Sequence, residues 1–381
     1  MVEASQFLNV LRSEGVEFFT GVPDSLLQPL CREISLSIDP ERHVIAANEG
    51  AAIALAAGWH LATRSVGCVY MQNSGLGNAI NPLVSLADPD VYGIPMLLIV
   101  GWRGEMRDGR QMKDEPQHVQ QGRITPAMLD LLEIPSAIVG PESADIETTV
   151  AALVGRARRE ERPCALIVRA NTFAAGGAES EPTSPHILTR EQVVDFLVDR
   201  LPSEATIVTT TGKLSRELYE IRGKRRQPTD HDFLTVGSMG HAVQIASGIA
   251  MARPRSRVVC LDGDGAMIMH MGALTVSARV PNLLHIVINN GAHDSVGGQP
   301  TAGFEIDMLG IARSCGYGFV GRTTTLEDLE KHLREALATR GAAFIEVRTR
   351  TGARVDLGRP KASPAEAKRA FMRHLSMSNP G

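Results

Sequence analysis

Two stretches of sequence decide the fold: residues 258–270 read VVCLDGDGAMIMH, and residues 286–293 read IVINNGAH. Each begins with a short apolar run and continues with glycine, aspartate or asparagine. Runs of this length that are apolar on both faces predict buried strands of a parallel sheet. Glycines directly after such a strand allow a tight turn into a helix, where backbone amides can approach a phosphate group. The two stretches therefore predict an α/β fold with a ligand site beyond the carboxyl ends of its strands.

Asp264 and Asn290 are candidate ligands of a divalent cation in this site. An acidic side chain among phosphate groups requires a cation between them, and carboxylate and amide oxygens are ligands that suit Mg²⁺. The backbone carbonyl of Ala292 is a third candidate ligand. Three further positions are candidates to hold a diphosphate: Gly263, Gly265 and Ala266. The GDG taken alone would indicate a simple turn and the asparagine pair a strand cap, but their occurrence at two successive strand ends favours the ligand site.

The alternation of short apolar runs with amphipathic runs extends over most of the chain. Strands are predicted at 18–20, 44–46, 66–71, 96–100, 165–168, 207–210, 258–261, 284–288 and 343–347. Helices are predicted at 5–14, 51–62, 148–159, 190–199, 242–251, 266–279, 326–340 and 364–375. Strands and helices in alternation indicate parallel sheets covered by helices.

A stretch rich in Gly, Ser, Pro and Glu interrupts this alternation and predicts an interdomain linker. We therefore expect a first α/β domain over residues 1–172, a linker over 173–188, a second α/β domain over 189–353 and a tail with a helix over 354–381. The two domains are of similar size and show no strong internal sequence repeat.

Composition excludes several classes of protein. The chain has 381 residues, 43% of them hydrophobic and 22% charged, which is typical of globular proteins rather than disordered or fibrous ones. A net charge of −4 argues against a general nucleic-acid binder. No apolar run is long enough to span a membrane, and the first residues do not resemble a signal peptide. Five scattered cysteines without CxxC spacing predict reduced thiols in a cytoplasmic protein.

The GDG followed some two dozen residues later by NN resembles the diphosphate and Mg²⁺ motif of the thiamine diphosphate-dependent enzymes. The resemblance implies two cofactor-binding domains and the cofactors thiamine diphosphate and Mg²⁺. It also implies that Glu49, which opens a predicted helix, bonds the aminopyrimidine of the cofactor and promotes its deprotonation. In the segment GSMG, it implies that Met239 is an apolar wedge and that the Gly237 carbonyl accepts from the aminopyrimidine. From the residues alone, Glu49 could equally be a helix-dipole partner and Met239 a core residue.

Further segments resemble one branch of these enzymes, the phosphonopyruvate decarboxylases, with the sulfopyruvate decarboxylases as close neighbours. The segments are FFTGVPDSLL, QNSGLGN, DEPQH, TTGK, GSMGHA, NNGAHDSVGGQPT and DLGRP. This branch lacks the middle domain of other thiamine diphosphate decarboxylases, and the predicted linker is too short to contain one. The resemblance implies decarboxylation of 3-phosphonopyruvate to phosphonoacetaldehyde and CO₂ in phosphonate biosynthesis, with the product entering either antibiotic or 2-aminoethylphosphonate synthesis. It also implies a homo-oligomer, at least a dimer, with the active site between subunits. Sulfopyruvate decarboxylase and, with less support, a carboligase remain as alternatives.

The resemblance also implies roles for polar residues of the site. Asp24, alternatively a helix N-cap, and His118 are candidates for proton transfer. A phosphonate substrate needs fixed cations, for which Arg103, Lys113 and Lys213 are the candidates. Other positions expected near cofactor or substrate are Gly212, His293 and Gln299. The glutamate that acetaldehyde-forming decarboxylases carry shortly after NN is absent here, which leaves His118 or His293 to protonate the product, although His293 could equally be a loop histidine bonded to backbone.

Overall fold

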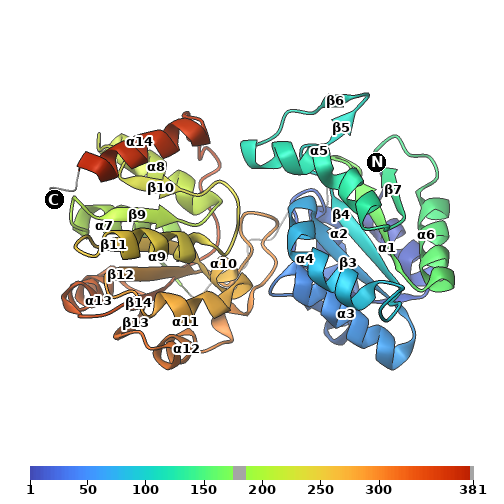
Figure 1. Ribbon diagram of the computed structural model, residues 1–381, viewed down its shortest axis with the longest axis horizontal. Coiled ribbons are helices and arrows are strands. Elements are labelled where there is room, and N and C mark those ends of the chain that lie inside the picture. Colours follow the sequence, from blue (N-terminus) through green and yellow to red (C-terminus); the bar gives the residue numbers. More distant parts are fainter. Residues whose placement is uncertain (175–185, 378–381) are drawn as a thin grey trace. The chain divides into compact units, whose positions relative to one another are not determined.

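The computed structural model describes residues 1–174 and 186–377 (Figure 1). The described residues fall into two compact units, one on each side of residues 175–185. Each unit contains one six-stranded sheet in which all strands are parallel. The prediction of two parallel-sheet α/β domains is confirmed. Most of the predicted linker, residues 173–188, lies outside the described residues.

The first unit has the strand order β2-β1-β3-β4-β8-β7. Its strands are β1 (Val16–Gly21), β2 (His43–Ile45), β3 (Val66–Gln72), β4 (Met96–Gly101), β7 (Ser136–Val139) and β8 (Pro163–Val168). A small antiparallel hairpin lies between β4 and β7 in the chain, formed by β5 (Met106–Arg107) and β6 (Arg110–Gln111).

Side chains that alternate along the central strands of this unit belong to two separate apolar clusters, so both faces of the sheet are covered. Cys68 and Tyr70 pack with helices α1 (Ala4–Ser13), α2 (Gln28–Ser37) and α6 (Ile146–Glu160). Val69 and Met71 pack with α3 (Glu49–Thr63), α4 (Leu76–Pro82) and α5 (Pro116–Leu131). A strand covered on both faces is apolar at every position, which is why β3, β4 and β8 were predictable as buried strands.

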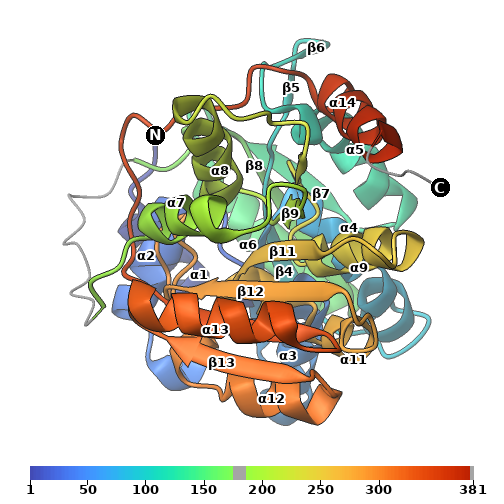
Figure 2. The same cartoon turned by 90° about the vertical axis from the view of Figure 1, so that its left-hand side faces the viewer.

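The second unit has the strand order β10-β9-β11-β12-β14-β13, of which β9, β11, β12 and β13 are labelled in Figure 2. Its strands are β9 (Thr206–Thr209), β10 (Asp232–Leu234), β11 (Val258–Gly263), β12 (Leu283–Asn289), β13 (Phe319–Thr323) and β14 (Ala343–Arg348). One face of this sheet packs against α7 (Arg190–Arg200), α8 (Lys213–Lys224) and α13 (Leu326–Ala338). Apolar clusters on other strand positions include α9 (Ala242–Ala252), α10 (Asp264–Met269) and α12 (Met308–Cys315). The last helix is α14 (Pro364–Met377).

The two sheets have the same topology. If the hairpin β5–β6 is set aside and the strands of each unit are numbered from one to six, both orders read 2-1-3-4-6-5. The chain therefore reverses direction across each sheet at the same place, between β1 and β3 in the first unit and between β9 and β11 in the second. The carboxyl ends of strands at such a reversal point are the usual ligand sites of open α/β sheets.

One predicted helix is wrong in its extent. Residues 266–279 were expected to form one continuous helix, but α10 ends at Met269 and a separate short helix, α11 (Leu274–Ser277), follows. His270, between them, has φ −133° and ψ 48°, which is not helical. Its ring lies against Gly240, where a Cβ would be 2.6 Å from His270 Cδ2.

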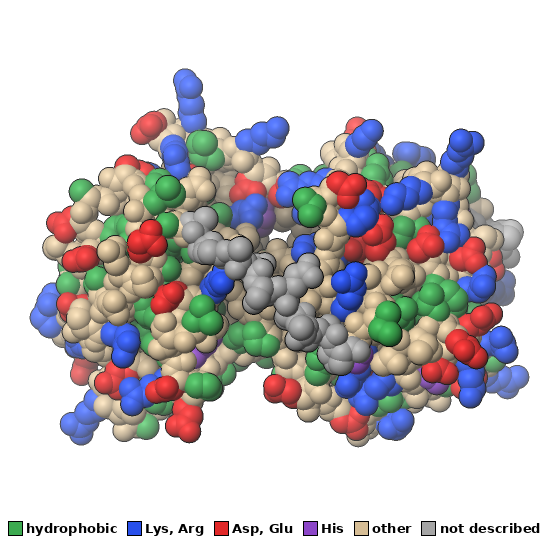
Figure 3. Space-filling view, turned by 180° about the vertical axis from the view of Figure 1, so that it is seen from behind, with side chains coloured by type: hydrophobic (Ala, Val, Ile, Leu, Met, Phe, Trp, Pro, Cys, Tyr) green, Lys and Arg blue, Asp and Glu red, His purple; other side chains and the backbone are tan. Residues whose placement is uncertain are grey.

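Other features agree with the expectations from composition. All five cysteines are free, and four of them are buried. Among the described residues, no helix has the length and apolar character required to cross a bilayer. On the face shown in Figure 3, basic and acidic side chains are interspersed over each unit, as expected for a chain with a net charge of −4.

Candidate active site

Asp264 is buried at the carboxyl end of β11, where it begins α10. Its carboxylate accepts hydrogen bonds from the Thr301 hydroxyl and from the backbone N–H of Asn290, the latter at 3.4 Å. Burial raises the pKa of Asp264 from 3.8 to about 6, against the lowering effect of these donors. These donors are neutral, so a divalent cation would supply the positive charge that a buried carboxylate calls for.

The turn after β12 places Asn290 beside Asp264. The Asn290 Oδ1 atom accepts from the Ala292 backbone N–H at 3.1 Å, which leaves one lone pair of this oxygen for another partner. Gly291 makes the turn with φ +67°. The structure thus brings Asp264 and Asn290 together, and Ala292 follows in the same turn, in a bridge to Pro300.

Close backbone approach explains two glycines around this carboxylate. A Cβ on Gly303 would lie 2.7 Å from Asp264 Oδ2, and a Cβ on Gly265 would lie 3.1 Å from the ring of His293. Ala266, the next residue of α10, is buried. Any larger side chain at Gly265 or Gly303 would displace the groups that surround Asp264.

Lys213 begins α8 directly after Gly212, whose φ is +102°. The Lys213 ammonium donates to the Asp294 backbone carbonyl at 2.8 Å and lies 3.6 Å from the Asp294 carboxylate. Asp294 also accepts from Arg190 at 2.9 Å, and Arg190 forms a buried ion pair with Glu217. Lys213 is therefore already paired with a carboxylate, and this network fastens the loop 291–301 to α7 and α8.

His293 and Gln299 lie opposite each other in this loop, with the His293 N–H donating to the Gln299 carbonyl at 2.8 Å. Burial lowers the pKa of His293 to about 4, so its ring is neutral at physiological pH. The Gln299 side-chain oxygen is buried and has no hydrogen-bond partner among the described residues. The backbone of His293 is thus bonded within its loop, as the loop interpretation expects, and its ring lies close to Gly265.

The GSMG segment precedes α9. Gly237 and Met239 are half-buried, and Met239 belongs to none of the apolar clusters of the described residues. Within this chain, Met239 therefore does not lie in an apolar core. An apolar side chain left outside the core is consistent with the wedge rather than the core interpretation.

Glu49, in the first unit, is the first residue of α3 and is buried. Its Oε2 accepts from the Asn78 amide at 2.7 Å. A Cβ on Gly75 would lie 2.4 Å from Glu49 Oε1, so only glycine fits there. The carboxylate is thus enclosed by the segment QNSGLGN, which was singled out for its glycines, whereas the role of Asn78 was missed.

Asp24, Arg103 and His118 lie together in the first unit. Asp24 is buried, one of its oxygens has no partner among the described residues, and burial raises its pKa to about 6 against the opposing charge of Arg103. Arg103 donates from Nε to Asp114 at 2.8 Å and from Nη1 to Ser25 at 2.9 Å. The His118 Nδ1 atom is buried without a partner among the described residues, and burial and Arg103 lower its pKa.

Sequence reasoning missed Asp114 as a functional residue. Asp114 forms a bidentate ion pair with Arg103, and its negative charge raises the pKa of His118 against the effect of burial. It lies in the quoted segment DEPQH, and its neighbour in sequence, Lys113, is exposed instead. An acidic residue four positions before His118, in the same segment, was the available signal.

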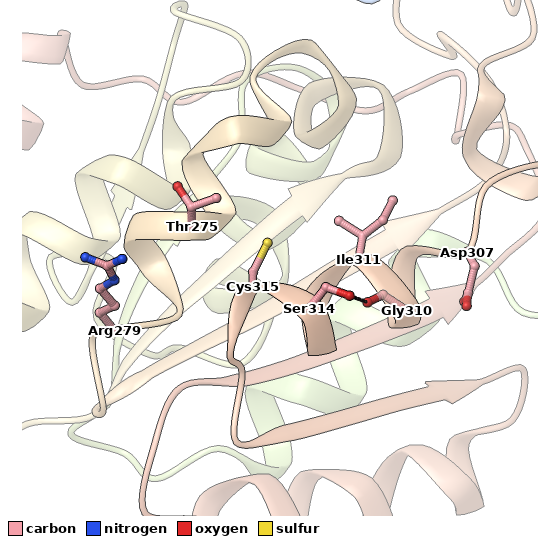
Figure 4. A pocket seen from close by; sticks show the side chains of 7 residues that line it. All are labelled: Thr275, Arg279, Asp307, Gly310, Ile311, Ser314 and Cys315. Carbon is pink, nitrogen blue, oxygen red and sulfur yellow. Dashed lines mark hydrogen bonds between the residues drawn. The ribbon is translucent and has the colours of Figure 1, made fainter.

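An open hollow of about 600 Å³ lies elsewhere in the second unit (Figure 4). It is lined by Thr275, Arg279, Asp307, Gly310, Ile311, Ser314 and Cys315. None of the candidate residues contributes to it, and the Ser314 hydroxyl is satisfied by the Gly310 carbonyl at 2.8 Å. The hollow is therefore separate from the candidate residues, which lie at the strand ends.

Comparisons with known proteins match a cofactor-binding domain to a large part of each unit. Residues 1–127 match the thiamine pyrophosphate enzyme N-terminal TPP binding domain, and residues 210–347 match the C-terminal TPP binding domain; thiamine pyrophosphate is a synonym of thiamine diphosphate. Phosphonopyruvate decarboxylases of Streptomyces viridochromogenes and Streptomyces hygroscopicus are each 38% identical to this chain, over 97% of its length and 94% and 93% of theirs. A sulfopyruvate decarboxylase of Methanosarcina acetivorans is 26% identical over 97% of both chains. The chain therefore belongs to the thiamine diphosphate-dependent enzymes, in the phosphonopyruvate decarboxylase family of decarboxylating lyases.

Proposed function

We propose that this enzyme decarboxylates 3-phosphonopyruvate to phosphonoacetaldehyde and CO₂, with thiamine diphosphate and Mg²⁺, in the biosynthesis of phosphonate natural products, including antibiotics. The observation that carries the proposal is the cluster of Asp24, Arg103 and His118. It combines a guanidinium, suited to an oxyanion, with two protonatable side chains that each have a buried atom without a partner among the described residues. Similarity to the Streptomyces phosphonopyruvate decarboxylases over nearly the full chain supports the choice of substrate.

The residues present fit the expected cofactors. Asp264, Asn290 and the Ala292 carbonyl would hold Mg²⁺, and Gly212, Gly263, Gly265 and Ala266 would hold the diphosphate. The buried, uncompensated carboxylate of Asp264 is the observation that supports a cation there. Gly237, Met239 and Glu49 would contact the thiamine. Bound thiamine diphosphate supplies an electron sink for the carbanion that loss of CO₂ creates.

Three carboxyl or imidazole groups would move the protons of the reaction. Glu49 would exchange a proton with the aminopyrimidine at its Oε1 atom, because Oε2 is already bonded to Asn78. The raised pKa of Asp24 allows its carboxyl to be partly protonated near neutral pH, so that it can donate a proton. The neutral ring of His118 can accept or donate through its unpartnered Nδ1.

Anionic groups of the substrate would be bound by Arg103, Lys113, Lys213, His293 and Gln299. Arg103 and Lys213 each have a carboxylate partner, Asp114 and Asp294 respectively, so they are oriented before substrate arrives. Orientation of this kind lowers the entropic cost of binding. The free side-chain oxygen of Gln299 would accept from a protonated phosphonate oxygen.

The enzyme is further proposed to be a cytoplasmic homo-oligomer, at least a dimer, whose active site lies between subunits. Its free and mostly buried cysteines are compatible with a reducing compartment.

A coupled aldehyde assay tests the proposal. Purified protein with Mg²⁺ and thiamine diphosphate would receive phosphonopyruvate, sulfopyruvate or pyruvate, with the Glu49→Gln variant in parallel. We expect phosphonopyruvate to be turned over far faster than the other two acids, and activity to disappear without cofactor and in the variant. A preference for sulfopyruvate would keep the mechanism and overturn the substrate. No turnover of any acid by a cofactor-bound protein would overturn the substrate assignment and point to a carboligase or an inactive paralogue.

A further inference from the structure

Three potential metal ligands meet where the last helix of the chain packs against the edge of the second sheet. Asp230 and His231 precede β10, the edge strand of that sheet, and His374 lies near the end of α14. One ligand atom from each of the three residues lies within 4.8 Å of the others. The rings of His231 and His374 are stacked, with centroids 3.8 Å apart and an interplanar angle of 26°. None of these residues takes part in the proposed reaction.

The hydrogen bonds of His231 direct a lone pair into this cluster. Its Nδ1 atom lies 3.2 Å from the Ser203 carbonyl oxygen, which can only accept, so Nδ1 carries the proton. The Nε2 atom of the neutral ring therefore has a free lone pair, and this atom lies 3.9 Å from Asp230 Oδ1. A backbone carbonyl that fixes the tautomer of a histidine in this way is the usual outer partner of a metal-ligating imidazole.

Asp230 supplies the second observation. Its Oδ1 atom is buried and has no hydrogen-bond partner among the described residues. The distance of 3.9 Å to His231 Nε2 is too long for a hydrogen bond. It is shorter than two zinc–ligand bonds placed end to end, about 4.1 Å, so one ion can contact both atoms. A buried carboxylate oxygen without a donor is what a bound cation would satisfy.

The charges near His374 are of both signs. Arg253 is positive and Asp230 is negative, so the Asp230 carboxylate offsets the Arg253 guanidinium near a bound cation.

The cluster lies where α14 has few other attachments. Within this helix only Phe371 is buried, and its ring packs on Phe233 of β10 with centroids 5.5 Å apart. Met372 and Met377 are exposed. A link at His374, one turn beyond Phe371, would therefore add a second attachment between the tail helix and the sheet edge.

We propose that Asp230, His231 and His374 form a binding site for a transition metal ion of the Zn²⁺ type that fastens α14 to the edge of the second sheet. Two imidazole nitrogens and one carboxylate favour Zn²⁺ over Mg²⁺, which prefers oxygen ligands. Three protein ligands leave at least one coordination position of the ion to water. The site is separate from the proposed cofactor site and does not depend on the proposed function.

The experiment uses the full chain loaded with thiamine diphosphate and excess Mg²⁺, so that the cofactor site is not available to Zn²⁺. Zn²⁺ binding would be measured by calorimetric titration, and release of α14 by the rate of limited proteolysis near the C-terminus. His374→Phe is the decisive variant, because it keeps a stacking ring and removes the ligand atom. His332→Phe, on α13, is the matched control, since His332 also lies against an aromatic ring, that of Phe319 at 5.8 Å between centroids, and bonds the Arg322 carbonyl at 3.1 Å, but is not one of the three proposed ligands.

We expect one Zn²⁺ per chain for the wild type and for His332→Phe, and no binding at this site in His374→Phe or His231→Phe. If cleavage occurs from the released helix, Zn²⁺ at ten times its Kd should slow proteolysis about tenfold. Absence of Zn²⁺ binding to the wild type would overturn the proposal. So would binding of equal affinity and stoichiometry by His374→Phe, because the ion would then lie elsewhere.

Discussion

Arg103 and Asp114 form a two-point ion pair, in which Nε donates to one carboxylate oxygen at 2.8 Å while Nη2 donates to the other. The pair sets the direction of the guanidinium before any substrate binds. Asn73 fixes the backbone of Arg103 as well, accepting from its N–H at 3.2 Å and donating to its carbonyl at 3.0 Å. A cation supported on both sides in this way is suited to orient an anion.

Asp114→Asn should lower kcat/KM by about 10- to 100-fold, because charged hydrogen bonds of this kind contribute about 1.5–3 kcal/mol. It should also lower the pKa of His118, since Asp114 is the group that raises it. The pH profile of kcat/KM measures both effects. Asp108→Asn, on the same loop but exposed, is the control and should leave the profile unchanged. Equal profiles for the two variants would contradict a role for the Arg103–Asp114 pair.

Glu49→Gln separates its two interpretations. If Glu49 transfers a proton, the variant should lose about 10²- to 10⁴-fold in kcat while still binding thiamine diphosphate. Glu147→Gln removes a carboxylate from the first turn of another helix, α6, and provides the comparison for a mere dipole partner. Turnover by both variants at wild-type rates would leave Glu49 with only the dipole role.

Asp264→Asn should stabilise the protein without cofactor above pH 6. Burial raises the pKa of Asp264 from 3.8 to about 6, so between these pH values the folded state binds more protons than the unfolded state, and stability falls as pH rises. Above pH 6 the folded state must bury a charged carboxylate, which lowers the free energy of unfolding by about 3 kcal/mol. Thermal unfolding at pH 7.5 should show a variant at least as stable as wild type without ligands, and no stabilisation by Mg²⁺ with thiamine diphosphate. A cofactor-dependent rise in Tm equal to that of wild type would exclude Asp264 as a metal ligand.

Asp24→Asn should change the pH dependence of catalysis. Because the pKa of Asp24 is raised to about 6, its acid form is present below that pH and declines tenfold per pH unit above it. If Asp24 donates a proton in the limiting step, kcat/KM of the wild type should fall above pH 6. The variant should be slower throughout and should lack this decline. If kcat/KM of Asp24→Asn still declines with the same midpoint pH as that of the wild type, the decline belongs to another group.

Met239→Ala distinguishes a wedge from a core residue. Since Met239 is half-buried and outside the apolar clusters, its truncation should cost less than about 1 kcal/mol of the free energy of unfolding. Met267→Ala, at a position only 2% exposed, should cost about 2–5 kcal/mol by comparison. Activity should nevertheless fall in Met239→Ala by more than its small loss of stability explains. Denaturation curves would measure the stability, and cofactor titrations would measure the binding of cofactor. Similar losses of stability in the two variants would support the core interpretation instead.

The central strands were predictable because both of their faces are buried. Strands such as β3 and β12 are apolar at nearly every position, and their patterns do not depend on neighbours far away in the chain. Of the four edge strands, β2 overlaps the strand predicted at 44–46, whereas β7, β10 and β13 were not predicted. β7 and β13 contain half-exposed positions and polar residues, so no apolar run marks them. Helix α8 was also missed, because its buried residues are mixed with charged ones such as Glu217.

By itself, the sequence determined the family, the parallel sheets and the positions of Glu49, Asp264 and Asn290, because glycines and polar residues directly after apolar runs are local signals. Only the tertiary structure decided which partners these residues have. Asn78 for Glu49, Thr301 for Asp264 and Asp114 for Arg103 come from segments 11 to 37 residues away. The burial that raises the pKa of Asp24 and Asp264, and the contact of His374 with His231, likewise depend on packing. Such contacts are set by how whole elements pack together, and a linear pattern of residue types carries no information about them.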